Sequence, residues 1–129
     1  MRRPDWDLDR LDGEAGEHLV AHLLRSDNIE VKHDLQAMTT GQLYIETECL
    51  YRTGWGPSGI TTTKADAWFF VLDLASKVTL SVDTQRLKQE VEYYKDKRPL
   101  ELTDGSHQTK GVGVPLTALT RERDLHFPG

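Results

Sequence analysis

A regular alternation of residue types from Leu43 to about Tyr51 is the feature that most constrains how this chain folds. The residues of one side are Leu43, Ile45, Thr47 and Cys49, and those of the other side are Tyr44, Glu46 and Glu48. A period of two predicts a strand with one buried face. The strand is therefore expected to carry two carboxylates, those of Glu46 and Glu48, on a single face.

A third acid lies upstream of this pair. Asp34 ends a second alternating segment, Ile29 to Asp34, and a turn-like segment from Thr39 to Gln42 separates the two. Pairing of the two predicted strands would bring the Asp34 carboxylate beside Glu46. Converging carboxylates repel one another unless a cation lies between them, and ligands that are all oxygens suit a hard ion such as Mg²⁺.

An amphipathic helix is predicted from Gly13 to about Ser26. Its apolar stripe consists of Gly16, Leu19, Val20, Leu23 and Leu24. Glu17 lies at the edge of this stripe, so a helix packed on the sheet can direct Glu17 towards the acid cluster. Glu14, one turn earlier, is the alternative.

The second half of the chain predicts two further strands and a helix. Ala67 to Leu74 is a nearly continuous apolar run typical of a central strand, and alternation over residues 78–82 predicts the next strand. Asp83 is a suitable N-cap for a helix that ends near Lys97.

Loops and a last strand complete the expected order. Gly54 to Gly59 is interpreted as a mobile loop at the edge of the site, and residues 102–110 as a polar loop. Residues 111–116 are expected to form an edge strand, because Pro115 has no N–H to donate to a ladder. The resulting order α-β-β-β-β-α-β predicts an α/β fold with a small mixed sheet flanked by helices.

Composition limits the possible classes of protein. A chain of 129 residues is expected to form one domain, with residues 1–12 as a loose arm. No segment resembles a membrane span or a signal peptide, so we expect a cytoplasmic protein. The single cysteine, Cys49, excludes an internal disulfide and any cysteine-rich zinc site. The net charge of −5 argues mildly against a nucleic-acid partner, although bound cations would balance an acid cluster.

The order and spacing of these acids resemble the PD-(D/E)xK nuclease superfamily over residues 13–116. The chain is most similar to small RecB-like and Holliday-junction-resolvase-like members of the kind carried by phages. The resemblance implies a restriction-endonuclease-like α/β sandwich and Mg²⁺-dependent hydrolysis of DNA, with Mn²⁺ as a substitute, in bacterial or phage-infected cytosol. The metal ligands that it implies are Asp34, Glu46, the Thr47 carbonyl and Glu17.

The chain departs from the superfamily at the third motif position, where Glu48 replaces the usual lysine. One interpretation is that Glu48 binds metal or acts as a general base. The other is that Lys64, just before the apolar strand, supplies the positive charge at the scissile phosphate. We expect both residues to act, so the expected catalytic set is Asp34, Glu46, Glu48 and Lys64.

The expected substrate is DNA with ends, flaps or branches, because Trp55, Tyr51 and the flexible glycine-rich loop could stack on unpaired bases. Substrate-binding roles are assigned to Trp55, Ser58 and Lys64. Cleavage of a junction would require a homodimer, whereas trimming of ends would not. Two alternatives stay open: a catalytically inactive nucleic-acid-binding module with the same fold, and an interaction protein whose acids are structural or bind Ca²⁺.

Overall fold

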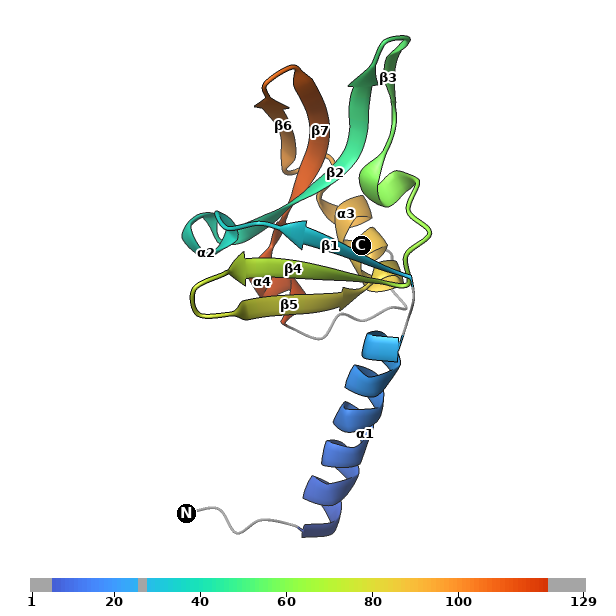
Figure 1. The fold of residues 1–129 in the computed structure, drawn as a ribbon, viewed down its shortest axis with the longest axis vertical. Coiled ribbons are helices and arrows are strands. Elements are labelled where there is room, and N and C mark those ends of the chain that lie inside the picture. Colours follow the sequence, from blue (N-terminus) through green and yellow to red (C-terminus); the bar gives the residue numbers. More distant parts are fainter. Residues whose placement is uncertain (1–5, 26–27, 121–129) are drawn as a thin grey trace.

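A computed structural model describes residues 6–25 and 28–120, with the surroundings of side chains described from residue 14 onward. The fold is α/β, as expected (Figure 1). The helices are α1 (Trp6–Arg25), α2 (Ala37–Thr40), α3 (Thr84–Tyr94) and α4 (Leu116–Leu119), with a short 3₁₀ helix η1 (Gly59–Thr61). The strands are β1 (Ile29–His33), β2 (Gln42–Tyr51), β3 (Gly54–Pro57), β4 (Ala67–Asp73), β5 (Val78–Asp83), β6 (Pro99–Asp104) and β7 (His107–Pro115).

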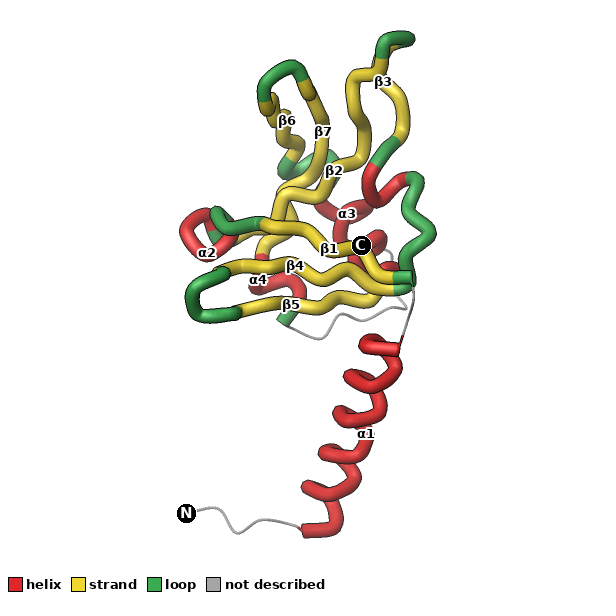
Figure 2. The backbone as a smooth tube through the Cα atoms, in the orientation of Figure 1, coloured by secondary structure: helices red, strands yellow, loops and turns green. Residues whose placement is uncertain are grey.

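The described strands form two sheets rather than the one small mixed sheet expected. The first is mixed, with the order β1-β4-β5, and β1 runs parallel to β4. The second is antiparallel, with the order β3-β2-β7-β6. The hairpins β2–β3 and β6–β7 project side by side from the body of the molecule (Figure 2).

The core lies where the two sheets and α3 meet. Trp68 and Phe70 of β4 are almost completely buried together with Leu43 and Ile45 of β2, so the alternation that predicts β2 also defines its buried face. Burial of such large apolar side chains stabilises the fold by about 1.5–3 kcal/mol each.

Helix α3 confirms the interpretation of its sequence. The Asp83 side chain caps it by accepting hydrogen bonds from the Gln85 and Arg86 N–H groups at 3.0 and 3.2 Å. Its inner stripe of Leu87, Val91 and Tyr94 is buried, as expected.

Strand pairing differs from the expectation at β1 and β2. These strands do not pair with each other: β1 pairs with β4, and β2 pairs with β3 and β7. The expected mobile loop from Gly54 to Gly59 instead forms β3 and the start of η1. β3 forms a hairpin with the end of β2, and hydrogen bonds from Ser58 and Thr61 to the Thr47 carbonyl hold η1 against the same strand.

The C-terminal half also contains one more hairpin than expected. The predicted polar loop at residues 102–110 forms part of β6 and β7, joined at a tight turn containing Gly105 at φ 62°. The prediction that the last strand lies at an edge is wrong, because β6 covers the other side of β7. Pro115 is accommodated because it is the last residue of β7.

Helix α1 begins at Trp6, so residues 6–12 of the expected loose arm are helical, and residues 1–5 lie outside the described part of the chain. It extends away from both sheets instead of packing on them (Figure 1). None of the helices among the described residues has the length and apolar character that crossing a bilayer requires.

Candidate functional site

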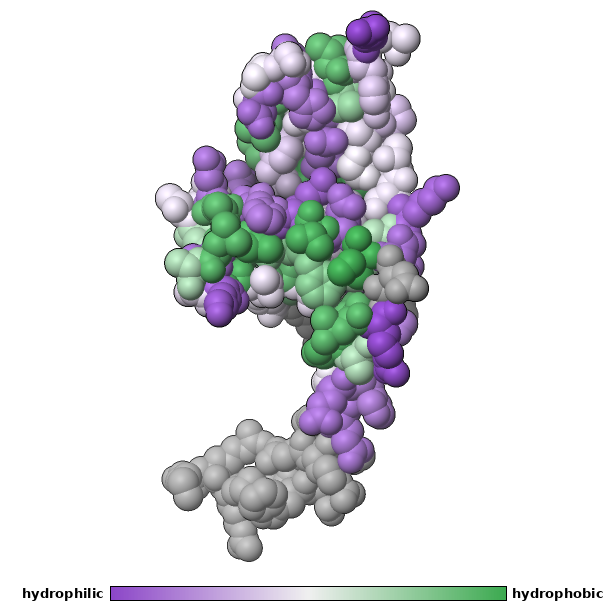
Figure 3. All heavy atoms as spheres, viewed as in Figure 1, coloured by the Kyte–Doolittle hydropathy of each residue, from purple (hydrophilic) through white to green (hydrophobic). Residues whose placement is uncertain are grey.

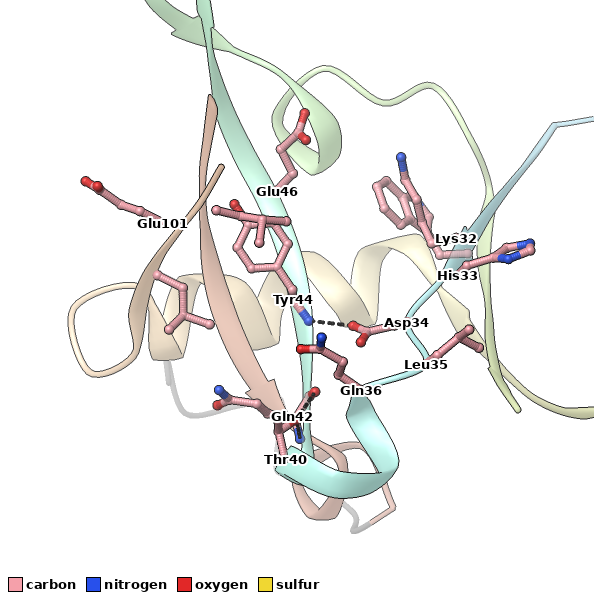
Figure 4. Close-up of a pocket in the computed structure, with 13 residues that line it drawn as sticks. Lys32, His33, Asp34, Leu35, Gln36, Thr40, Gln42, Tyr44, Glu46 and Glu101 are labelled. Carbon is pink, nitrogen blue, oxygen red and sulfur yellow. Dashed lines mark hydrogen bonds between the residues drawn. The ribbon is translucent and has the colours of Figure 1, made fainter. Parts of the chain in front are cut away.

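A cavity of about 560 Å³ opens between the end of β1 and the start of β2, and we call it the Asp34 pocket. Its lining includes Lys32, Asp34, Tyr44, Glu46 and Trp68 (Figure 4). Asp34 and Glu46 thus reach one pocket from two different sheets. They do so without the β1–β2 pairing that the sequence suggested.

Asp34 is held at the junction of the two sheets. Its N–H donates to the Val71 carbonyl at 3.0 Å, which extends the β1–β4 ladder, and its Oδ2 accepts the Tyr44 N–H at 2.8 Å. Burial raises the pKa of the Asp34 carboxyl above its usual value, and the hydrogen bond from Tyr44 lowers the pKa by less. A nearby cation would favour the ionised form of this carboxyl.

A bulge at Thr47 interrupts β2 within the predicted acidic face. Glu46 lies opposite Gly111, and Glu48 lies opposite the preceding residue of β7, Lys110. The Thr47 carbonyl accepts hydrogen bonds from the Ser58 N–H at 3.0 Å and from Thr61 Oγ1 at 2.9 Å. Both acceptor positions of the proposed metal-binding carbonyl are therefore engaged by the segment around η1.

Glu48 lines a different cavity from Glu46, the Glu48 pocket, which also contains Glu92, Lys95 and Lys110. Glu48, Lys110 and Glu101 occupy adjacent positions across β2, β7 and β6. Such alternating charges are typical of cross-strand pairing on a solvated sheet. The structure does not bring Glu48 into the Asp34 pocket.

Lys64 lines a smaller cavity, the Lys64 pocket, which also includes Glu30, Lys32, Glu46 and Trp68. Glu46, Lys32 and Trp68 are common to this cavity and the Asp34 pocket, so the two adjoin. Lys32 Nζ lies 3.0 Å from Glu30 Oε1 and 5.7 Å from the centroid of the Trp68 ring. Carboxylates and ammonium groups thus line the combined site, and Lys32 and Glu30 form an ion pair there.

Lys32 was not singled out from the sequence, although its position in the chain contains the necessary information. Glu30, Lys32 and Asp34 alternate, so the strand period that places Asp34 on one side of β1 places Lys32 there too. A lysine on an alternating strand is typical of a solvated face, so Lys32 received no predicted role from the sequence.

The segment after β3 fits tightly against the bulge. Gly59 has φ 56°, and a Cβ atom there would lie 2.2 Å from the Glu46 carbonyl oxygen. Ser58, expected to bind substrate, is buried, and its Oγ has no hydrogen-bond partner among the described residues. Ser58 thus lies beneath the surface in this structure rather than open to a large substrate.

Trp55, also expected to bind substrate, is exposed on β3, outside the Asp34 and Lys64 pockets. Lys110 Nζ lies 4.3 Å from the centroid of its ring. Tyr51, at the end of β2, is also exposed. Two exposed aromatic side chains therefore lie on the projecting β2–β3 hairpin, and Lys110 of β7 places a positive charge beside one of them.

The described residues contain no group of three or more His, Cys, Asp or Glu side chains arranged to hold a metal ion. Glu17 is exposed on α1 and lines neither the Asp34 pocket nor the Lys64 pocket. Glu14, the alternative helix acid, is likewise exposed. Asp34 and Glu46 line the same pocket, and in Figure 4 the Glu46 carboxylate points away from Asp34.

Comparison with protein-family models, curated proteins and solved structures finds no match to this chain. Any assignment of function therefore depends on the geometry of the two adjoining pockets.

Proposed function

We propose that this protein is a metal-dependent deoxyribonuclease that hydrolyses phosphodiester bonds. The observation that carries the proposal is that Asp34, Glu46 and Lys32 line one pocket, with Lys64 in the adjoining pocket. Two carboxylates can bind a hard cation, and two lysines can bind a phosphate group that the cation would also contact. The sequence resemblance to PD-(D/E)xK nucleases supports the same chemistry and a related α/β sandwich.

Asp34 and Glu46 are the proposed ligands of Mg²⁺, for which Mn²⁺ can substitute. When bound, the ion would activate a water and stabilise charge on the phosphoryl oxygens. The Tyr44 N–H orients the Asp34 carboxylate by binding its Oδ2. The tight contact of Gly59 with the backbone of Glu46 supports the second ligand.

Lys64 and Lys32 are the proposed phosphate-binding residues. Lys64 is exposed, so its ammonium group can approach a polymeric substrate from solvent. Lys32 is partly buried and held by Glu30. We propose that these two lysines replace the lysine that is missing from the motif. Glu48 lines a separate pocket, so it is given no catalytic role.

The proposed substrate is DNA with ends or branches, as occurs in recombination, repair and replication. Exposed Trp55 and Tyr51 on the β2–β3 hairpin can stack on unpaired bases, and Lys110 adds a positive charge beside Trp55. Recognition by stacking depends on strand structure more than on base sequence, which favours a structure-selective exonuclease or a flap or junction endonuclease.

A second candidate is a nucleic-acid-binding module that lacks catalysis. It is favoured by one observation: Asp34, Glu46 and Glu101 line the pocket, yet the described residues contain no group of three such side chains arranged to hold a metal ion. Such a protein would bind DNA with a strong dependence on salt and would leave every phosphodiester intact.

The deciding experiment is cleavage of labelled duplex, single-stranded, flap and four-way-junction DNA with Mg²⁺, Mn²⁺ or EDTA. We expect metal-dependent cleavage that both Asp34→Ala and Glu46→Ala abolish. Asp104→Ala, at an exposed acid of the β6–β7 hairpin, is the control and should cleave normally. Salt-dependent binding without cleavage by folded protein would instead establish the binding module.

A further inference from the structure

The aromatic ring of Tyr44 forms part of the wall of the Asp34 pocket. It extends from β2 over Gly111 of β7, where an added Cβ atom would lie 2.8 Å from the Tyr44 Cζ. Its hydroxyl shares a hydrogen bond of 2.6 Å with Thr109 Oγ1, and Thr109 is buried. The ring is therefore held against β7 along one side and at its tip, while the residue stays partly exposed.

Apolar side chains line the same pocket as this ring. Leu35 and Leu102 belong to its lining although they are 50% and 51% exposed. Leu100, which lies opposite Gly111 in the sheet, lines the pocket as well. Half-exposed leucines in a pocket gain favourable burial when an apolar surface of a ligand covers them. The Asp34 pocket thus has an apolar part beside its charged part.

The pocket has room for more than a metal ion and a phosphate group. Its volume is about 560 Å³, within the usual range of about 300–1,000 Å³ for pockets that bind small organic ligands. Figure 4 shows the Gln36 amide directed into the pocket, towards Tyr44. Within the part of the chain that the structure describes, this amide makes no hydrogen bond, so its donor and acceptor can serve a ligand.

The apolar part of the pocket adjoins the proposed phosphate-binding residues. Lys32 lines the same pocket, and Lys64 lines the next one. Figure 3 shows a band of hydrophilic side chains that crosses this face between the projecting hairpins and the mixed sheet. Each nucleotide of a strand combines a charged phosphate with a flat base that can stack. The charged and the apolar parts of the combined site correspond to these two parts of one nucleotide.

We propose that the Asp34 pocket binds one unpaired nucleobase, stacked on the Tyr44 ring, beside the phosphate that Lys32 and Lys64 bind. A base inside a duplex cannot enter, because its neighbours cover its faces and its edge is paired. The protein therefore acts where an unpaired nucleotide adjoins the cleaved bond, as in a single strand, a flap or a frayed end. This inference rests on the proposed function, which supplies the phosphate, and it adds Tyr44 as a residue that determines specificity.

Cleavage of single strands from which one base at a time is removed tests the inference on the unaltered protein. An abasic nucleotide at one position beside the cleaved bond should lower kcat/KM by roughly 5- to 100-fold, the scale of losing one base–aromatic stack. Equal cleavage of the intact strand and of every abasic strand would overturn the base pocket and leave the nuclease standing.

Substitutions at Tyr44 identify the ring as the stacking surface. Tyr44→Leu should slow cleavage of the intact strand by a similar factor and should remove the difference between intact and abasic strands. Tyr44→Phe is the matched control, because it keeps the ring and loses only the bond to Thr109, so the difference should persist. Both variants keep the backbone N–H that binds Asp34 Oδ2, and circular dichroism establishes that both retain the fold. The same difference in Tyr44→Leu as in Tyr44→Phe would overturn the assignment.

A binding measurement separates failure of this inference from failure of the nuclease. The probe is a single-stranded trinucleotide containing 2-aminopurine, titrated in EDTA with the Asp34→Asn protein, which lacks one charge that repels phosphate. Saturable quenching of its fluorescence that Tyr44→Leu removes and Tyr44→Phe retains would support the base pocket even if no strand is ever cleaved. Metal-dependent cleavage without such quenching would retain the nuclease and overturn the pocket.

Discussion

At the scale of single residues, burial opposes the ionisation of the Asp34 carboxyl. Burial raises its pKa, which means that the folded chain binds the proton more tightly than the unfolded chain does. The stability linked to this group is therefore present at low pH and is lost as the pH rises through the raised pKa. Without a cation, an ionised Asp34 destabilises the fold.

The substitution Asp34→Asn is accordingly expected to raise the melting temperature in EDTA at neutral pH. Asparagine stays neutral and can still accept the Tyr44 N–H through its carbonyl oxygen. The advantage over wild type should shrink as the pH falls into the range where Asp34 is protonated. Thermal melts of the two proteins across pH measure the difference, and an advantage that grows towards acid would contradict the assignment.

Lys64 offers a test of the phosphate-binding role. Lys64→Ala should lower cleavage by roughly 100- to 1,000-fold, the scale of losing one group that stabilises developing charge, while metal binding persists. Lys88→Ala is the control, because Lys88 lies on α3 and lines neither pocket. Single-turnover cleavage and metal-dependent melting separate the two effects. Undiminished cleavage by Lys64→Ala would transfer the role to Lys32.

At the scale of elements, the packing of η1 on β2 determines the shape of the site. The bulge at Thr47 separates Glu46 from Glu48, and Ser58 and Thr61 hold it in place through the Thr47 carbonyl. A regular strand would return the two glutamates to one face. The segment after β3 is thus part of the support of the Asp34 pocket.

Gly59→Ala should lower the free energy of unfolding by about 2 kcal/mol or more, because the added Cβ meets the backbone of Glu46 in addition to the strain of a positive φ. Gly105→Ala is the matched control. Gly105 has a similar φ of 62°, but a Cβ there meets nothing within 4 Å, so only about 1 kcal/mol should be lost. Urea unfolding of both variants measures the contrast, and equal losses would show that the contact with Glu46 costs nothing.

At the scale of the whole molecule, the net charge of −5 makes cations generally stabilising, and a specific site must be separated from that background. Mg²⁺ at 100 times its dissociation constant is expected to stabilise the fold by about 2.7 kcal/mol. Sodium chloride at equal ionic strength should do much less. The double variant Asp34→Asn with Glu46→Gln should respond equally to both salts in melting experiments, and a retained preference for Mg²⁺ would place the metal elsewhere.

Across the whole molecule, the elements that could be predicted from the sequence are those with a regular pattern of apolar residues. Periodicity is local, so β2, β4 and β5 could be recognised from their own residues, and α3 from its stripe and its Asp83 cap. When one face of an element is buried, its apolar residues recur with the period of a strand or a helix. The pattern therefore identifies the type of element whichever partner covers it. Asp34 and Glu46 were selected in the same way, from their places on alternating strands.

Only the tertiary structure decided which strands pair and where the side chains meet. Segments that are distant in the chain are joined by the pairing of β1 with β4, by the bulge at Thr47 and by the cavity that Lys64 and Glu46 both line. Periodicity carries no information about partners, and a bulge depends on what the neighbouring strand and loop require. The amino-acid sequence by itself therefore determined the elements and the acids they carry, whereas the packing between elements determined which charges share a pocket.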